Sequence, residues 1–292
     1  MLKLTFQYPA TTTVLEENYV NVNVPFKTWV YSGGEVQVRL LELPKPPAAA
    51  RLFALLCNTQ DFIELLMLTN AIKEAYPDTP IHLRCPYLPG ARQDRVCSPG
   101  DAFALKVYAQ LLNAQNYVSV EVLDPHSDVA LKLVDRIYPL DAAGLAADVL
   151  KNTVAGRNAV PDWSKAWLIQ PDHGAAARTQ TLAALLNTKI LGTAALLNIK
   201  IFGTGAKKRD PTTGEITRME IHKWALRECK GHTLIIADDI CDGGRTFIEL
   251  AKVLRPYQPK AIVLYVSHGI FSKGLAVFDG YIDHVLSPYS FQ

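Results

Sequence analysis

Short apolar runs alternate with longer amphipathic stretches along most of the chain. Nearly continuous apolar runs are typical of parallel strands that are covered on both faces. We expect strands at residues 36–40, 52–57, 81–85, 118–123, 166–170, 233–237 and 261–266. Between them, apolar residues recur at spacings of three and four and predict helices at residues 61–76, 101–114 and 245–255. This alternation predicts an α/β fold of mainly parallel sheets flanked by helices, with ligands outside the carboxyl ends of the strands.

The length of 292 residues predicts two domains, at roughly 150 residues for each. The segment 151–163 contains Gly, Pro and Asn and is the best candidate for a linker region, so we expect domains at residues 1–145 and 146–292. Residues 184–194 and 195–205 form a tandem repeat, ALLNTKILGTA followed by ALLNIKIFGTG. We interpret it as a duplication tolerated at a helix-to-strand edge; an extra strand or a subunit contact is the alternative.

The composition narrows the class of protein. Hydrophobic residues make up 49% and charged residues 20%, which is typical of a globular chain. The formal charge of +2 gives no signal for a nucleic-acid partner, and no apolar stretch approaches the roughly 18 residues of a membrane helix. The five cysteines include no CxxC pair, as expected of reduced thiols. With no signal-peptide pattern at the start, we expect a cytoplasmic protein with neither a membrane nor a nucleic-acid partner.

The strongest chemical signal is IIADDICDGGRT (235–246), where an apolar strand runs into two aspartates and a Gly-Gly turn before a helix. Backbone N–H groups of such a turn and of a helix N-terminus bind phosphate. Carboxylates at the strand end can hold ribose hydroxyls or magnesium. The segment therefore predicts a sugar-phosphate site, with an ordinary acidic turn as the structural alternative.

Four further polar segments follow predicted strands or interrupt the pattern. ARQDR (91–95) carries two guanidinium groups, which match phosphate oxygens bidentately. DPHS (124–127) and PDHGAAAR (171–178) place Asp, His and small residues at strand ends, where they can meet a metal or a phosphate. In GTGAKKRDPTTGE (203–215), Lys207 and Arg209 alternate, so that an extended strand would point both the same way.

In this order, the motifs resemble those of the ribose-phosphate diphosphokinases (phosphoribosyl pyrophosphate synthetases). The likeness runs from YSGGEVQVRL (31–40) to VSHGIF (266–271). It implies two related phosphoribosyltransferase-type domains, the first with the ATP loop and the second with the catalytic flap and the ribose-phosphate loop. It also implies assembly into a homodimer or hexamer.

The resemblance further implies that Mg²⁺ and ATP take part in transfer of the β,γ-diphosphoryl group of ATP to ribose 5-phosphate, with release of AMP. It places at the ATP site Tyr31, Glu35, Arg92, Gln93 and Asp94. It assigns a catalytic role to Lys207, Arg209 and His126, and metal binding to His126 and Asp172. It places at the acceptor site Asp238, Asp239, Asp242, Gly243, Gly244, Arg245 and Thr246.

The chain departs from the family pattern in its acceptor loop. The family loop usually reads Asp-Thr-Gly-Gly-Thr, whereas Gly243 removes a hydroxyl and Arg245 adds a cation. A larger ribosyl acceptor such as ADP-ribose, as in NAD salvage, is therefore an alternative to ribose 5-phosphate. A non-catalytic regulatory homologue is a third reading, against which the intact Lys207, Arg209 and His126 count.

Overall fold

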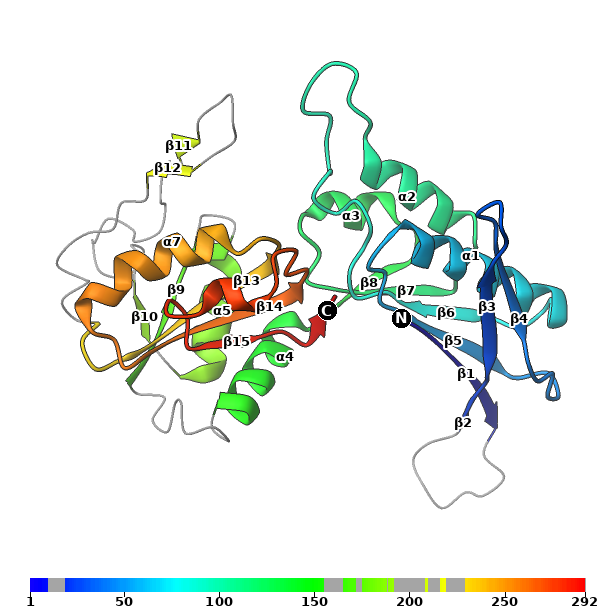
Figure 1. The fold of residues 1–292 in the computed structure, drawn as a ribbon. Coiled ribbons are helices and arrows are strands. Elements are labelled where there is room, and N and C mark those ends of the chain that lie inside the picture. The colour runs from blue at the N-terminus through cyan, green and yellow to red at the C-terminus, as the bar shows by residue number, and fades with distance from the viewer. Residues whose placement is uncertain are drawn as a thin grey trace. The chain divides into compact units, whose positions relative to one another are not determined.

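The computed structural model describes residues 1–9, 19–154, 165–171, 175–187, 189–191, 208–209, 216–218 and 229–291. The chain forms two compact units, Met1–Leu140 and Asp141–Gln292, which are described separately (Figure 1). The division falls shortly before the boundary expected from the sequence, because the helix that follows Leu140 packs within the second unit. No helix in the described part of the chain is long and apolar enough to cross a membrane.

The N-terminal unit contains a mixed six-stranded sheet in the order β2-β1-β5-β6-β7-β8. Four strands are parallel: β5 (Ala49–Ala54), β6 (Ile81–Arg84), β7 (Ser119–Leu123) and β8 (Ile137–Leu140). The hairpin of β1 (Leu2–Pro9) and β2 (Tyr19–Asn23) adds to the edge in antiparallel orientation. A separate antiparallel hairpin joins β3 (Phe26–Val30) and β4 (Val36–Leu40), so the apolar run at 36–40 is not a strand of the parallel sheet.

The helices of this unit all belong to one hydrophobic core. They are α1 (Thr59–Ala75), α2 (Ala104–Asn113) and α3 (Asp128–Leu133) (Figure 1), and their buried side chains share this core with those of β1, β5, β6 and β7. Side chains in these strands alternate between buried and more exposed, as in Leu4 and Phe6 against Lys3 and Thr5. The expectation that strands are covered on both faces is therefore wrong for the described residues of this unit, because most side chains on the face away from the helices are polar, such as Lys3, Arg51 and Glu121.

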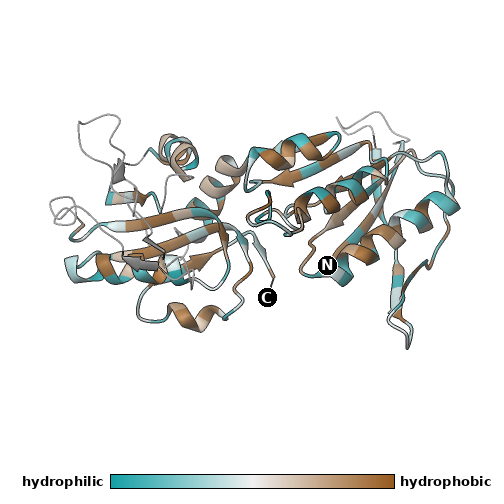
Figure 2. Ribbon diagram, turned by 90° about the horizontal axis from the view of Figure 1, so that it is seen from above, coloured by the Kyte–Doolittle hydropathy of each residue, from teal (hydrophilic) through white to brown (hydrophobic). Residues whose placement is uncertain are grey.

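The C-terminal unit is built on a parallel sheet in the order β10-β9-β13-β14-β15. Its strands are β9 (Ala166–Ile169), β10 (Lys189–Leu191), β13 (Thr233–Cys241), β14 (Ala261–Gly269) and β15 (His284–Leu286), and β16 (Tyr289–Ser290) also pairs with β14. Every residue of β9 and β14 is buried. Figure 2 shows the central strands of this sheet as predominantly hydrophobic.

Two separate cores cover the two faces of this sheet. Leu234, Ile236 and Leu264 pack with α7 (Arg245–Leu254) and the 3₁₀ turn η5 (Leu275–Phe278). On the other face, Ile235 and Val263 pack with α4 (Ala142–Val149) and α5 (Ala176–Leu186). In this unit the continuous apolar runs are parallel strands covered on both faces, as predicted. The mixed α/β class with parallel sheets flanked by helices is confirmed.

The remaining elements are short. A π-helical turn, η1 (Leu150–Val154), follows α4, and the 3₁₀ turn η4 (Arg255–Tyr257) follows α7. β11 (Lys208–Arg209) and β12 (Ile216–Arg218) pair in antiparallel orientation, so the backbone of Arg209 is extended. The first copy of the tandem repeat covers the end of α5 and β10, and the second copy lies outside the described residues.

Candidate functional site

The carboxyl ends of β9, β13 and β14 form one edge of the C-terminal sheet, because the three strands are parallel. In the register, Ile236 of β13 lies opposite Ile169, and Cys241 lies opposite Gly269. The predicted acidic segment therefore leaves the sheet where the segments after β9 and β14 also begin. This is the edge at which open α/β sheets bind ligands.

Asp238 and Asp239 lie within β13 and not beyond it, because the strand extends to Cys241. The Arg178 guanidinium, in the first turn of α5, donates to Asp238 Oδ1 at 3.2 Å. Both side chains of this pair are mostly buried, with 16% and 14% exposed. Arg178 thus joins the segment after β9 to the acidic strand end, a role that the sequence alone did not single out.

Asp239 is almost fully buried, with 8% exposed. Its Oδ1 accepts a hydrogen bond from the backbone N–H of Ile240 at 2.8 Å. A backbone donor of this kind holds the carboxylate in one orientation. Asp238 Oδ1 likewise accepts from the backbone N–H of Asp239 at 3.0 Å, so both aspartates are held by their own strand and Asp238 has the Arg178 guanidinium in addition.

The turn after β13 is tied to the turn after β14. The backbone N–H groups of Ile270 and Phe271 both donate to the carbonyl of Cys241, at 2.9 and 3.2 Å. Ser272 Oγ donates to Asp242 Oδ1 at 2.6 Å. The predicted acceptor loop is therefore supported by residues about thirty positions later in the chain.

Gly244 is the N-cap of α7 and has a φ of 75°, in the left-handed region that favours glycine. A Cβ at this position would lie 2.6 Å from Cζ of Phe278, whose ring is buried. No side chain caps α7 at Gly244. An uncapped helix N-terminus after a glycine turn is a typical cradle for a phosphate group, as the sequence predicts.

Gly243 does not face empty space. A Cβ at this position would lie 3.5 Å from Cε and 3.7 Å from Cγ of Lys273. The lysine stem therefore runs beside the loop at ordinary van der Waals distance, while Arg245 is exposed at the start of α7 and Thr246 is partly buried behind it. Lys273 is a residue that sequence reasoning missed; the only signal was its position in IFSKG, directly after the predicted late turn.

Cys241 lies between these elements, and burial followed by the nearby Asp242 raises the pKa of its thiol to about 12. Burial and the nearby carboxylate therefore disfavour the thiolate, which is the nucleophilic form of a cysteine. The loop consequently supplies backbone N–H groups, carboxylates and cations.

In the N-terminal unit, two of the predicted ATP motifs leave neighbouring parallel strands. ARQDR follows β6 and DPHS follows β7, and the backbone N–H of Leu123 donates to the Pro86 carbonyl where the two strands end. The backbone of Gln93 accepts from Leu105 N–H at 3.3 Å, which attaches the ARQDR loop to the start of α2. The structure thus brings these two motifs to one edge of the sheet.

The side chains of Arg92 and Gln93 are exposed, Asp94 is partly buried, and His126 is exposed after β7. Asp124 turns the chain with a φ of 44°. Ser127 Oγ is enclosed and has no hydrogen-bond partner among the described residues. Unsatisfied buried polar groups are uncommon, and binding sites are one place where they occur.

Tyr31 and Glu35 lie at the tip of the β3–β4 hairpin. The Tyr31 N–H donates to the Glu35 carbonyl at 2.9 Å, and both side chains are exposed. The Glu35 carboxylate folds over Gly33, where a Cβ would meet its Oε2 at 2.5 Å. An exposed tip is compatible with a contribution to a neighbouring subunit, which stays a prediction.

The remaining predicted residues are described only in part. Lys207 and Asp172 lie outside the described residues, and Arg209 belongs to β11 by its backbone. Within the part of the chain that the structure describes, no three His, Cys, Asp or Glu residues form a metal cluster. Mg²⁺ is usually held by one or two carboxylates together with substrate phosphates and water, so an Asp at a strand end fits it.

Comparison with known proteins agrees with this arrangement. Residues 140–277 match the model of the phosphoribosyl transferase domain. The ribose-phosphate pyrophosphokinase of Bradyrhizobium diazoefficiens is 30% identical over 73% of this chain and 60% of its own length. That of Pyrococcus abyssi is 26% identical over 87% of this chain and 78% of its own.

The crystal structure of phosphoribosylpyrophosphate synthetase from Mycobacterium smegmatis superposes with a TM-score of 0.67 at 18% identity. It covers 91% of this chain and 80% of that one, so the shared fold extends over both units. The chain spans only 60% and 61% of the lengths of the Bradyrhizobium diazoefficiens and Mycoplasmopsis pulmonis enzymes. With its phosphoribosyl transferase domain and its collinear motifs, the chain belongs to the ribose-phosphate pyrophosphokinase family.

Proposed function

We propose that the protein transfers the β,γ-diphosphoryl group of ATP to the anomeric hydroxyl of ribose 5-phosphate. The hydroxyl oxygen forms a bond to the β-phosphorus, the bond from that phosphorus to the α,β-bridging oxygen breaks, AMP leaves, and the hydroxyl proton is released. The observation that carries the proposal is the edge at β13, where two carboxylates precede a glycine turn and an uncapped helix N-terminus. The names of the relatives support the same reaction.

Each group at this edge has a proposed task. Asp239 and Asp238 hold the ribose hydroxyls, and Arg178 keeps Asp238 in place. The turn at Gly243 and Gly244 binds the 5-phosphate through backbone N–H groups. Asp242 is held by Ser272 and shapes the turn.

The ATP groups lie in the first unit in this proposal. Arg92 and Gln93 bind phosphates or the base from the ARQDR loop, Asp94 orients that loop, and Tyr31 and Glu35 complete the site of a neighbouring subunit. His126 and Asp172 are the residues that would contact Mg²⁺, and the metal would supply positive charge to the phosphate oxygens of ATP. Lys207 and Arg209 stabilise charge that develops during transfer.

A second acceptor, ADP-ribose, is favoured by one specific observation. Lys273 lies beside Gly243, so this loop has a second cation in addition to Arg245. A phosphate monoester concentrates nearly two negative charges on one phosphorus, whereas the diphosphate bridge of ADP-ribose spreads two charges over two phosphorus centres, so two cations along the loop can each meet one of them. The reaction at the anomeric hydroxyl is the same for both acceptors.

The test is AMP release from Mg-ATP with ribose 5-phosphate and ADP-ribose measured side by side. A kcat/KM at least tenfold higher for one acceptor identifies it. No AMP release with either acceptor would refute the transfer and support a regulatory homologue. Light scattering on the same sample tests the proposed homodimer or hexamer, and a fully active monomer would contradict a site completed by Tyr31 and Glu35.

A further inference from the structure

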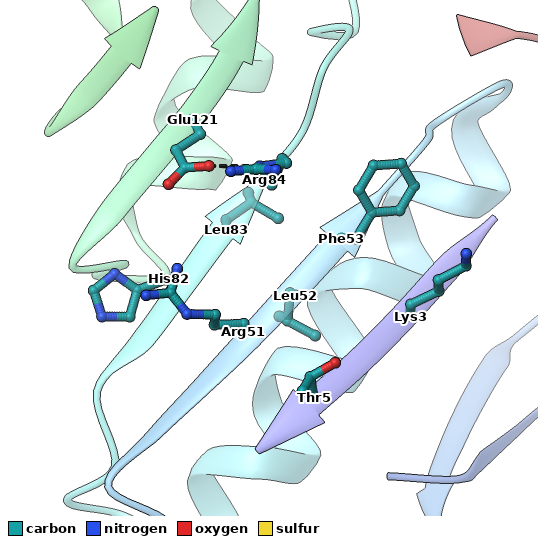
Figure 3. Close-up of a pocket in the computed structure, with 9 residues that line it drawn as sticks. All are labelled: Lys3, Thr5, Arg51, Leu52, Phe53, His82, Leu83, Arg84 and Glu121. Carbon is teal, nitrogen blue, oxygen red and sulfur yellow. Dashed lines mark hydrogen bonds and ion pairs between the residues drawn. The ribbon is translucent and has the colours of Figure 1, made fainter. Parts of the chain in front are cut away.

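The face of the N-terminal sheet opposite its helices carries two rows of side chains that run across four strands (Figure 3). Lys3, Phe53, Arg84 and Glu121 are register partners in one row. Thr5, Arg51, His82 and Ser119 form the other. Because alternate residues of a strand share a face, both rows rise from the side that the helical core does not cover.

These rows surround a pocket of about 250 Å³, lined by Lys3, Thr5, Arg51, Leu52, Phe53, His82, Leu83, Arg84 and Glu121. The pocket lies on the face of the sheet, whereas the ARQDR and DPHS loops leave its carboxyl edge. All of the lining residues belong to the first unit. Its size is below the roughly 300–1,000 Å³ of pockets for drug-sized ligands, which indicates a small ligand.

The charge of the pocket is positive. Arg84 donates to Glu121 Oε2 at 2.6 Å, so these two charges compensate each other. Lys3 Nζ lies 5.9 Å from the centre of the Phe53 ring. Among the residues that line the pocket, Glu121 is the one carboxylate, and it is paired with Arg84. Lys3 and Arg51 therefore have no carboxylate partner within the pocket, and their two positive charges remain for a ligand.

His82 adds a group that responds to these charges. Burial, and then the nearby Arg51, lower the pKa of its imidazole, while Glu121 acts in the opposite direction. Nδ1 of the ring is hydrogen-bonded to Ser119 Oγ at 2.8 Å, so the ring is held at the pocket wall. A bound anion would favour the protonated ring.

We infer that this pocket is a binding site for a compact phosphorylated anion, with Lys3 and Arg51 as its main charged partners. Guanidinium and ammonium groups on opposite sides of a small pocket can contact separate phosphate oxygens. The Phe53 ring adds an apolar surface beside Lys3, which favours a ligand of limited polar surface, such as a diphosphate carried on a small group. None of its lining residues belongs to the proposed acceptor site.

Inorganic diphosphate is the probe for the test, and His82 is the reporter. Protein with ¹⁵N-labelled histidine is titrated with diphosphate at constant ionic strength, and the ring nitrogens of His82 are followed by NMR. The spectrum of the His82→Gln variant assigns the resonances. We expect a saturable shift and a rise of the His82 pKa, because the anion stabilises the imidazolium.

The matched variants are Lys3→Gln, Arg51→Gln and Lys27→Gln. Each pocket variant should raise the diphosphate concentration at half-saturation by about tenfold or more, the effect of one lost charged contact. Lys27 is an exposed lysine of β3 outside the pocket, so its variant should behave as wild type. If diphosphate bound at the proposed catalytic edge instead, all three variants would show the same half-saturation concentration.

Two outcomes would overturn the inference. One is the absence of a saturable His82 shift at millimolar diphosphate. The other is an equal shift with sodium chloride at the same ionic strength, which would mean general screening. Circular dichroism verifies that each variant is folded before it is titrated.

Discussion

The two adjacent glycines of the acceptor loop differ sharply in what they can tolerate. Gly244 has a φ of 75°, and a Cβ there would lie 2.6 and 2.7 Å from Cζ and Cε1 of Phe278. Gly243 is outside the left-handed region, and its nearest neighbour would be Lys273 Cε at 3.5 Å. Gly244→Ala should therefore destabilise the loop, and Gly243→Ala is its matched control.

The size of the effect follows from two contributions. A non-glycine residue in the left-handed region costs about 1–2 kcal/mol. Overpacking against a buried ring adds about 1–3 kcal/mol, since Phe278 is only 2% exposed and has little room to move. Gly244→Ala should lower the free energy of unfolding of the second unit by about 2–5 kcal/mol. Gly243→Ala should change it by less than about 1 kcal/mol.

Urea unfolding followed by circular dichroism measures the stability, and hydrogen exchange of residues 245–254 reports the local effect on α7. A third variant separates the two contributions: adding Phe278→Leu to Gly244→Ala should recover the overpacking part but not the backbone part. The coupling free energy of that double-mutant cycle should then be about 1–3 kcal/mol. Equal stability of the two alanine variants would refute the reasoning from this loop geometry.

Three further predictions concern single groups. Iodoacetamide at pH 8 should alkylate the exposed Cys97 in the native protein. The buried Cys241, whose pKa is raised to about 12, should stay unmodified until urea is added. Mass spectrometry of the peptides measures both, and alkylation of Cys241 in the native protein would contradict the prediction. The pKa of His82 is lowered by burial and by Arg51, so the unfolded chain binds its proton more readily, and stability should fall as pH drops below about 6.5. His82→Gln should make this fall shallower, and an unchanged pH profile of unfolding would contradict it. Lys273→Met should raise KM for the acceptor about tenfold while kcat changes little, because a lost charged contact weakens binding. Lys260→Met, at a distant lysine, is the control. Equal kinetics of the two variants would mean that Lys273 is not part of the site.

The positions at which the parallel strands begin were the most predictable part of the molecule. β6, β7, β9 and β14 begin within one residue of the apolar runs that predict them, because a buried parallel strand needs uninterrupted apolar side chains. The motifs after these strands could therefore be placed at sheet edges from the sequence. β13 is longer than its apolar run, since Asp238 and Asp239 continue the strand with carboxylates that accept from Arg178 and from Ile240 N–H.

The sequence was less informative where long-range pairing decides the structure. The β1–β2 hairpin adds to β5 in antiparallel orientation, and its polar alternation was not recognised as a strand pattern. The run at 36–40 looks like the other strands, yet Val38 and Leu40 pack in the core with α1 while their strand pairs only with β3. Contacts such as that of Lys273 with the loop around Gly243 depend on the turn geometry after β14, which no local pattern encodes.

The arrangement around β13 separates the charges of the acceptor site into two groups with different freedom. Arg178 and Ser272 already engage two of the three carboxylates, and Asp239 is almost fully buried. Lys273 instead lies along the outside of the turn on an exposed, flexible stem. A ligand therefore meets carboxylates held in place at the strand end and a flexible lysine, Lys273, at the turn. The lysine can move to neutralise either a single phosphate or a longer diphosphate, while the carboxylates keep the same contacts to the ribose. On this argument, the choice between ribose 5-phosphate and a larger ribosyl acceptor is made at the turn, and the comparison of KM values for the Lys273→Met variant with both acceptors is the measurement that decides it.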